Sequence, residues 1–186
     1  IDGPVAAGKG TVARLLASRL GFLYVDTGAM YRTTALLAKQ QDTDWNNEAK
    51  LVELLGKHTI TLRSPLESEK DGRQITILLD NEDVSWAIRT EEMSRGSSVV
   101  SQFQNVRKVL VEQQRNIAET TDVVMEGRDI TFRVLPEAQL KIYLDATLEV
   151  RAKRCHAELL SRGVDTSYEN VLRDIQDRDD RDMHRT

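Results

Sequence analysis

The spacing of apolar residues divides the start of the chain into short segments of different periodicity. Apolar side chains recur at helical spacing across residues 12–20, and Gly21 follows where a helix would end. The apolar run at 22–25 predicts a strand, and helical spacing then resumes across 30–37. Another short helix is predicted at 51–55. The pattern therefore opens with a helix, a strand and two further helices.

Alternating apolar and polar residues next indicate a β-rich stretch. Two alternating runs, 58–62 and 74–79, flank a turn region that contains proline and glycine, so residues 57–80 are predicted to form a hairpin. Helical spacing returns across 90–120, with a break expected near Gln104–Asn105. The hairpin at 57–80 is predicted to be an insertion in an α/β core.

The remaining pattern completes that core. The apolar runs 122–126 and 140–144 lack alternation, which is typical of parallel strands buried on both faces. Helical stretches at 147–161 and 167–183 follow. Because strands and helices alternate, the sequence predicts an α/β fold in which helices flank a central parallel sheet.

Composition and charge narrow the class of protein. A chain of 186 residues with 40% apolar and 30% charged residues is typical of a single globular domain. A net charge of −4 argues against a nucleic-acid partner, no apolar run approaches the roughly 18 residues of a membrane span, and Cys155 has no second cysteine to pair with. We expect a cytoplasmic monomer. The chain starts without a methionine, so a segment trimmed at both ends is expected.

The opening residues carry the spacing of a phosphate-binding loop. Residues 3–9 read G-x-x-x-x-G-K, in which glycines allow backbone N–H groups and a helix N-terminus to converge on phosphate oxygens. The strict pattern places Ser or Thr directly after the lysine, whereas Gly10 intervenes here. An ordinary glycine-rich turn is the alternative, but the strand, loop and helix context favours a phosphate loop. The residues expected to bind ATP phosphates are Gly3, Ala6, Ala7, Gly8, Lys9, Gly10 and Thr11.

Four sequence blocks stand out, namely GKGT at 8–11, VDTGAMYR at 25–32, EGRDI at 126–130 and RDDRDMHR at 178–185. The first is similar to the loop of nucleoside monophosphate kinases, and the other three resemble the signatures of the bacterial cytidylate kinases. The resemblance spans the whole chain. It implies a P-loop kinase that transfers a phosphoryl group from ATP to CMP, and also to dCMP, with Mg²⁺ as cofactor.

The resemblance also implies an architecture and a set of functional residues. The family has a five-stranded parallel core, a small β-rich insertion that binds the nucleoside monophosphate, here about 57–92, and a short helical lid, here about 151–166. The expected catalytic residues are Lys9, Arg128, Arg151 and Arg154, and the expected metal ligands are Thr11 and Glu126, the latter through water. The expected CMP ligands are Thr27, Arg32, Ser98, Arg107, Arg128, Asp129, Asp182 and Arg185.

The acceptor-side residues suit the chemistry of CMP. Guanidinium groups clamp phosphate oxygens bidentately, and Asp129, Arg107 and Ser98 offer an acceptor and donors that match the edge of cytosine. Asp182 would bind a ribose hydroxyl with support from Arg178. Each arginine could instead be a solvated surface charge, and Asp129 could be a helix N-cap.

The sequence departs from the family pattern at two places. Glu126 stands where the family usually has Asp, and Ile130-Thr131-Phe132-Arg133 replaces a Gly-Thr pair, which leaves the role of Arg133 open. The residues expected to be structural or on the surface are His58, His156, His184 and Cys155, and those expected to pack are Trp45 and Trp86.

Two other functions stay open at this point. One is a P-loop kinase for another small acceptor, such as UMP or a non-nucleotide alcohol. The other is a nucleotide-dependent switch or a regulatory ATP-binding module. The acceptor-side arginines favour a kinase, because a switch would not need them.

Overall fold

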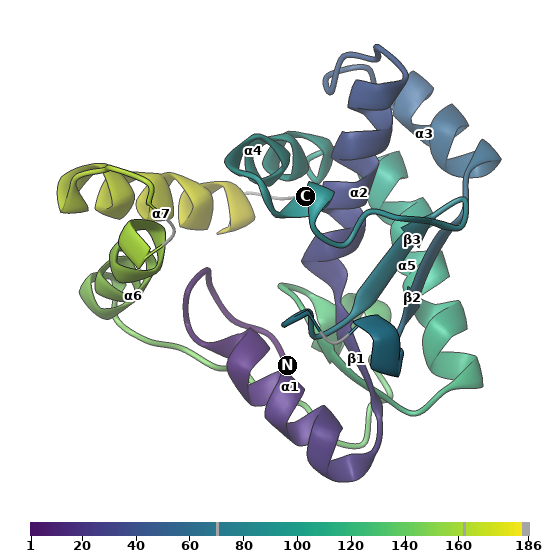
Figure 1. Ribbon diagram of the computed structural model, residues 1–186, viewed down its shortest axis with the longest axis horizontal. Coiled ribbons are helices and arrows are strands. Elements are labelled where there is room, and N and C mark those ends of the chain that lie inside the picture. The colour runs from purple at the N-terminus through teal and green to yellow at the C-terminus, as the bar shows by residue number, and fades with distance from the viewer. Residues whose placement is uncertain (70, 162, 184–186) are drawn as a thin grey trace.

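A small parallel sheet lies at the centre of the computed structural model (Figure 1). The structure describes residues 1–69, 71–161 and 163–183. β1 (Leu23–Asp26) pairs in parallel with β5 (Val123–Glu126), and Asp26 lies directly opposite Glu126. Isolated parallel bridges join Asp2 to Gly127 on one side and to Tyr143 on the other. The predicted α/β class with a central parallel sheet is confirmed.

Helices cover this sheet and provide most of the apolar core. α1 (Lys9–Leu20), α2 (Thr27–Gln40) and α5 (Gln104–Thr120) lie around it, and α3 (Glu48–Lys57) packs against α2 and α5. The largest side chains that are fully buried in this core include Val25, Met30, Leu37, Leu51, Ile77 and Leu110. α3 begins before the predicted residue 51, since the Asn47 side chain accepts a hydrogen bond from the Lys50 N–H and caps the helix.

α4 (Glu91–Val100) packs tightly against α2. The contact depends on Gly96, because a Cβ at this position would lie 2.7 Å from the Ala35 Cβ and 2.8 Å from the Trp45 ring. The break between α4 and α5 falls at residues 101–103, close to the predicted position. α4 is thereby held at a fixed distance from the helix that follows β1.

The β-rich insertion forms a separate antiparallel sheet. β2 (Ile60–Arg63) pairs with β3 (Thr76–Leu79), which confirms the predicted hairpin, and β3 pairs with β4 (Glu82–Asp83). β4 was not predicted, because two exposed acidic residues give no apolar alternation. Short 3-10 turns lie at Glu67–Glu69 and Ala87–Arg89, and a π-helical turn at Ile130–Val134.

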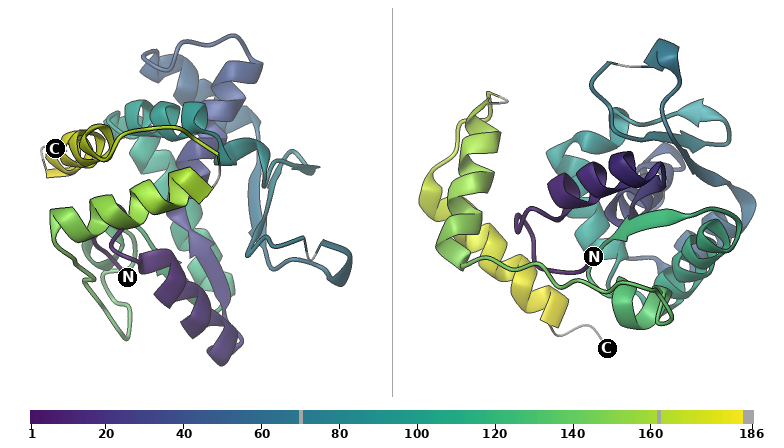
Figure 2. Two further views of the ribbon diagram at one scale, coloured as in Figure 1. Left: turned by 60° about the vertical axis from the view of Figure 1, so that its left-hand side comes forward. Right: turned by 90° about the horizontal axis from the view of Figure 1, so that it is seen from below.

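α6 (Leu148–Ser161) and α7 (Tyr168–Met183) form a pair with its own small core. Both helices match the predicted bounds closely. Their buried apolar side chains are those of Ala152, Val171 and Ile175. Figure 2 shows the loop before α1 lying between this pair and the rest of the molecule. In the described part of the chain, every helix is too short or too polar to cross a lipid bilayer.

The prediction of a buried strand at 140–144 was wrong. The segment bonds in parallel only to Asp2, whose N–H donates to the Ile142 carbonyl while its own carbonyl accepts from the Leu144 N–H. Leu140 and Tyr143 are 67% and 69% exposed. Ile142 and Leu144 pack against the core while Tyr143 between them is exposed, so the segment is covered on one face and not on both. Across the described residues the central sheet has four parallel segments.

Candidate active site

The opening loop adopts the backbone conformation that the glycine spacing predicts. Gly3, Ala6 and Gly8 have φ values of 149°, 58° and 101°, and a Cβ at Gly3 would lie 1.9 Å from the Leu144 carbonyl oxygen. Only glycine fits at position 3, since any side chain there would collide with backbone. The loop then enters α1 at Lys9, so the helix N-terminus stands directly behind it.

Lys9 crosses its own loop. Its Nζ donates a hydrogen bond of 2.8 Å to the Pro4 carbonyl oxygen, and the residue is only 7% exposed. Burial lowers the pKa of Lys9 to about 8, and the positive charge of Arg128 adds to this effect. The carboxylates of Glu126, Asp182 and Asp26 act in the opposite direction. A bound phosphate would add to their effect and favour the charged amine.

A cleft of about 740 Å³ opens between the loop, the insertion, α2, α4 and α7. The wall includes many of the predicted site residues, namely Ala6, Lys9, Thr27, Arg32, Ser98, Glu126, Arg128, Asp129 and Asp182. Eight other predicted residues are not part of its lining, namely Gly3, Ala7, Gly8, Gly10, Thr11, Arg107, Arg151 and Arg154. Arg185 lies outside the described residues. The sequence blocks at 25–32 and 126–130 thus meet in one cavity.

Asp26 organises the arginines on the α2 side of the cleft. Its Oδ2 accepts from Arg32 Nη2 at 2.6 Å and from Arg89 Nη1 at 3.1 Å, while Oδ1 accepts from the Ala29 N–H and caps α2. Burial alone would raise the pKa of Asp26, but the two guanidinium groups outweigh it and hold the pKa below its usual value. The Arg32 Nε is buried and has no hydrogen-bond partner among the described residues. A phosphate oxygen could satisfy this donor.

Thr27 and Glu126 lie at the carboxyl ends of the two paired strands. The Thr27 hydroxyl donates to the Glu126 carbonyl oxygen at 2.8 Å, which leaves the lone pairs of that hydroxyl available. The Glu126 carboxylate accepts from the Tyr24 hydroxyl at 2.5 Å. Burial, together with the nearby charge of Asp26, raises the pKa of Glu126.

Of the two expected metal ligands, Glu126 is placed where it could hold a hydrated magnesium ion and Thr11 is not. Mg²⁺ usually keeps several waters and is held by one or two carboxylates together with substrate phosphates. Glu126 offers one carboxylate in the cleft wall, next to the loop. Thr11 is exposed and does not line the cleft, and no group of three or more His, Cys, Asp or Glu in the described chain could hold a metal ion.

Arg128 joins three parts of the site. Its Nε donates to Asp182 Oδ2 at 2.6 Å, and its Nη1 donates to the Gly3 carbonyl oxygen at 2.7 Å. Arg178, which was expected to support Asp182, donates to the Ser94 hydroxyl at 2.5 Å. Arg128 forms an ion pair with Asp182, because Arg128 faces α7 from the end of β5.

The three residues expected to read the base are not all in the wall. Ser98 and Asp129 line the cleft, and the Asp129 side chain makes no capping bond to the π-helical turn that follows it. Arg107 lies behind the wall, where it donates to the carbonyl oxygens of Ser101 and Gln102. The turn is held instead by Asp2, whose carboxylate accepts from the N–H groups of residues 130 and 131.

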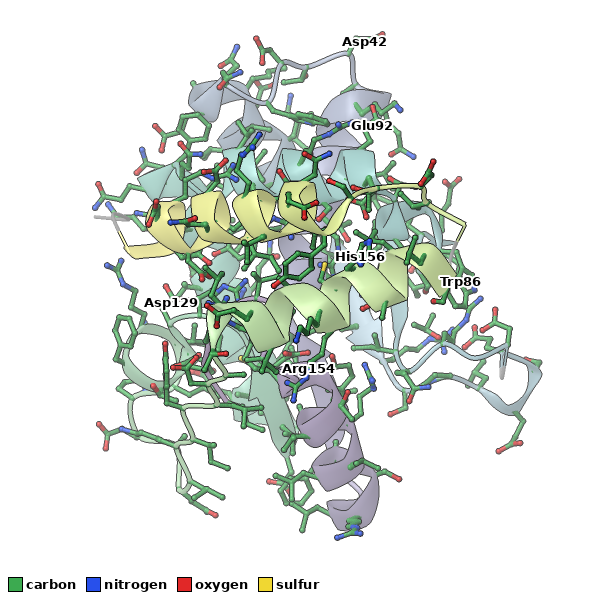
Figure 3. All side chains as sticks on the ribbon, turned by 90° about the vertical axis from the view of Figure 1, so that its left-hand side faces the viewer. Asp42, Trp86, Glu92, Asp129, Arg154 and His156 are labelled. Atoms are coloured by element: carbon green, nitrogen blue, oxygen red, sulfur yellow. The ribbon has the colours of Figure 1, made fainter. Side chains whose placement is uncertain are left out.

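The two lid arginines contact the back of the phosphate loop. Arg151 is buried, forms an ion pair of 2.6 Å with Asp179, and donates to the Val5 carbonyl oxygen at 3.3 Å. Arg154 donates to the Ala7 carbonyl oxygen at 3.1 Å, and Figure 3 shows it on α6. Both side chains thus hydrogen-bond to the loop backbone in this arrangement, so contact with a transferred phosphate would require them to move.

Trp86 is not the packing residue that was predicted. It is 52% exposed, lines the cleft and donates its indole N–H to Asp71 Oδ2 at 2.8 Å. Figure 3 places it at the opposite end of the α6–α7 face from Asp129. Trp45, by contrast, packs between α2 and α4 as expected. The residue type alone does not show from the sequence whether a tryptophan packs between helices or stands at the cleft.

Other functional candidates had no strong sequence signal. Asp26 stood in a recognised block, but its role depends on Arg89, which lies 63 residues away. Arg73 also lines the cleft and pairs with Asp71. The described histidines and cysteine are structural or on the surface as predicted: His58 pairs with Asp80, His156 bonds to the Thr166 carbonyl, and Cys155 packs with the α6–α7 core. His184 lies outside the described residues.

The loop before α1 lies at the carboxyl edge of a parallel sheet and faces a cleft that arginines line. This combination is typical of a P-loop kinase. A family model described as cytidylate kinase matches residues 1–186, so the chain belongs to the cytidylate kinase family.

Curated relatives agree with this assignment. The chain is 47% identical to a cytidylate kinase of Caldanaerobacter subterraneus subsp. tengcongensis over 185 residues, which cover 100% of this chain and 78% of the relative. It is 47% identical to that of Chloroflexus aggregans over 184 residues, 99% of this chain and 79% of the relative. It is 42% identical to that of Bacillus subtilis over 185 residues, 100% and 80% of the two chains.

Proposed function

We propose that this protein transfers the γ-phosphoryl group of ATP to CMP, and also to dCMP, and releases the nucleoside diphosphate. The observation that carries the proposal is that one cleft contains Lys9 of the phosphate loop and Arg32, whose buried Nε lacks a partner among the described residues. A phosphoryl transferase needs one cationic site for the donor phosphates and another for the acceptor phosphate.

Phosphoryl transfer in this cleft requires positioning and charge stabilisation more than covalent chemistry. The backbone N–H groups of the loop and Lys9 bind the ATP phosphates. Arg32 and Arg128 hold the CMP phosphate, and the Thr27 hydroxyl offers a further contact. With both nucleotides held in line, an acceptor phosphate oxygen attacks the γ-phosphorus while the bond to ADP breaks.

The cytosine base is read at the turn after β5. Cytosine presents an amino donor at N4 and acceptors at N3 and O2. Asp129 accepts from the amino group, and Ser98 with Arg107 supplies donors once Arg107 turns from its carbonyl partners. Uracil would leave these polar groups unpaired at a cost of about 1–3 kcal/mol each. CMP should therefore be preferred over UMP.

A bound Mg²⁺ would supply positive charge that offsets the negative charge of the ATP phosphates. Glu126 would hold it through water, while Thr11 would need to turn toward the cleft to contribute. The insertion at 57–92 would close over the acceptor, and the lid at 151–166 would bring Arg151 and Arg154 toward the transferred group. We further expect a monomer located in the cytoplasm, with nucleotides rather than nucleic acid as partners.

The test is product formation with a panel of acceptors. The protein is incubated with ATP, Mg²⁺ and CMP, dCMP, UMP, AMP or shikimate, and diphosphates are separated by ion-exchange chromatography. We expect CDP and dCDP, with kcat/KM for UMP lower by about tenfold or more. A preference for UMP or for the alcohol would overturn the substrate assignment. ATP binding without any transfer would indicate a switch or regulatory module.

A further inference from the structure

A polar cluster lies against the first turn of α1. A Cβ built on Gly10 would come within 2.9 Å of Glu126 Oε1, 3.2 Å of Arg14 Nη1 and 3.5 Å of Tyr24 Oη. Three side chains from three different elements therefore converge on the space that a side chain at position 10 would occupy. All three also line the cleft.

The Glu126 carboxylate is held in this space. The Tyr24 hydroxyl donates to Oε1 at 2.5 Å, and Tyr24 itself is only 8% exposed on β1. Glu126 follows from the neighbouring strand β5, so strand pairing fixes the distance between the two backbones. The carboxylate can leave its position only by losing the tyrosine hydrogen bond.

We propose that Gly10 and Tyr24 are positioning residues for the Glu126 carboxylate. The strict phosphate-loop pattern places a hydroxyl-bearing side chain directly after the lysine, and in this chain a carboxylate from β5 takes that space instead. Gly10 leaves room for the carboxylate, and Tyr24 aims it at the cleft. The inference rests on the proposed function in one respect, namely that Glu126 faces hydrated Mg²⁺.

A simple packing role for Gly10 would have a different consequence. The atoms that a Cβ would meet are the ends of side chains and not backbone, so the fold can accept alanine at position 10 by displacing them. We therefore expect Gly10→Ala to keep the wild-type melting temperature and to lose the magnesium effect, by which we mean the strengthening of ATP binding when Mg²⁺ is added. If packing were the only role, the melting temperature would fall and the magnesium effect would stay.

The experiment measures ATP affinity by isothermal titration calorimetry with and without Mg²⁺. The quantity of interest is the ratio of the two dissociation constants. Gly56→Ala is the matched control, because Gly56 is also helical and a Cβ there would meet nothing within 4 Å. We expect the control to keep the wild-type ratio. In Gly10→Ala the ratio should fall by about tenfold, which is typical when a residue that orients a metal ligand is changed.

Two further variants test the pairing itself. Glu126→Asp shortens the carboxylate by one methylene, so Gly10→Ala combined with Glu126→Asp should recover part of the ratio that Gly10→Ala loses. Tyr24→Phe removes the hydrogen bond alone and should lower the ratio by a smaller factor. A double variant no better than Gly10→Ala would overturn the proposal, as would a normal ratio in both Gly10→Ala and Tyr24→Phe.

Glu126→Gln separates this inference from the proposed function. If Glu126→Gln keeps the wild-type magnesium ratio, the assignment of Glu126 to the metal fails and this inference fails with it, while phosphoryl transfer to CMP still stands on the acceptor assay. If Glu126→Gln lowers the ratio and the Gly10 and Tyr24 variants do not, only the positioning inference fails.

Discussion

The two sides of the cleft differ in the partners that their cationic side chains contact. On the donor side the loop offers backbone N–H groups, and its neighbouring cations, Lys9, Arg151 and Arg154, donate to loop carbonyl oxygens. On the acceptor side the cations already have carboxylate partners, since Arg32 and Arg89 pair with Asp26. Lys9 and Arg154 on the donor side thus contact backbone carbonyl oxygens, whereas the acceptor-side arginines pair with a carboxylate. Arg151 has both kinds of partner, because it also pairs with Asp179.

This difference bears on how each side binds a phosphate. The donor loop is organised before ATP arrives, because its conformation follows from a few consecutive residues and a helix N-terminus. On the acceptor side, a phosphate must share or displace a carboxylate at each arginine. Binding there should depend on the arrangement of the charged groups more than on any single one.

The largest expected effect comes from removing the one cation that the donor loop carries. Lys9→Ala should lower kcat by about 100- to 1000-fold, because Lys9 stabilises charge on the transferring phosphate. CMP affinity should change by less than about twofold, since the acceptor side keeps its charges. Steady-state kinetics and calorimetry with CMP measure the two effects. Near-normal turnover would show that the loop is not the donor site.

The reciprocal change is Arg32→Ala on the acceptor side. Loss of a charged hydrogen bond of about 1.5–3 kcal/mol should weaken CMP binding by roughly 10- to 100-fold. ATP affinity should stay the same. Lys39→Ala is the control, since Lys39 belongs to the same helix and forms an ion pair with Glu92 that is about half exposed. Equal loss of ATP and CMP affinity would contradict the separation of the two sides.

A change at Asp129 tests, within the acceptor side, whether this residue distinguishes cytosine from uracil. Asp129→Asn can donate to O4 of uracil, so the CMP to UMP ratio of kcat/KM should narrow by about tenfold. The melting temperature should stay near the wild-type value, because the Asp129 side chain caps no helix. An unaltered ratio would remove Asp129 from the base site, and a lower melting temperature alone would indicate a structural role.

The smallest expected effect is a pH dependence confined to the donor side. Free Lys9 has a pKa of about 8, so kcat/KM for ATP should fall about fourfold by pH 8.5 while CMP affinity changes little. Unfolding does not explain such a fall. Between pH 8 and the ordinary lysine pKa of about 10.4, the unfolded chain binds more protons than the folded one, so Lys9 makes the free energy of unfolding rise with pH. A flat kcat/KM profile to pH 9 would contradict the role of Lys9.

Features encoded by neighbouring residues could be predicted from the sequence. The phosphate loop and the bounds of α6 and α7 follow from local spacing, and the structure has them as expected. The placement of Thr27, Arg32 and Asp129 in one cavity could be predicted only through the family resemblance.

Features that depend on distant residues could not be predicted. Asp2 holds the turn at 130 and 131 from the far end of the chain, and Arg128 pairs with Asp182, which lies 54 residues away. The run at 140–144 is apolar like a buried strand, yet Leu140 and Tyr143 are exposed, because the described residues cover the segment on one face. Such outcomes depend on which elements become neighbours, and spacing along the chain carries little information about that.

Trp86 gives the protein a built-in optical probe. The chain has two tryptophans, and Trp45 is packed between helices while Trp86 stands half exposed at the rim of the cleft. The Stokes shift of an indole depends on the polarity around it, so the emission of Trp86 reports whether water or nucleotide fills the rim. In a Trp45→Phe background, nucleotide exchange at the rim can be followed in real time without any added label.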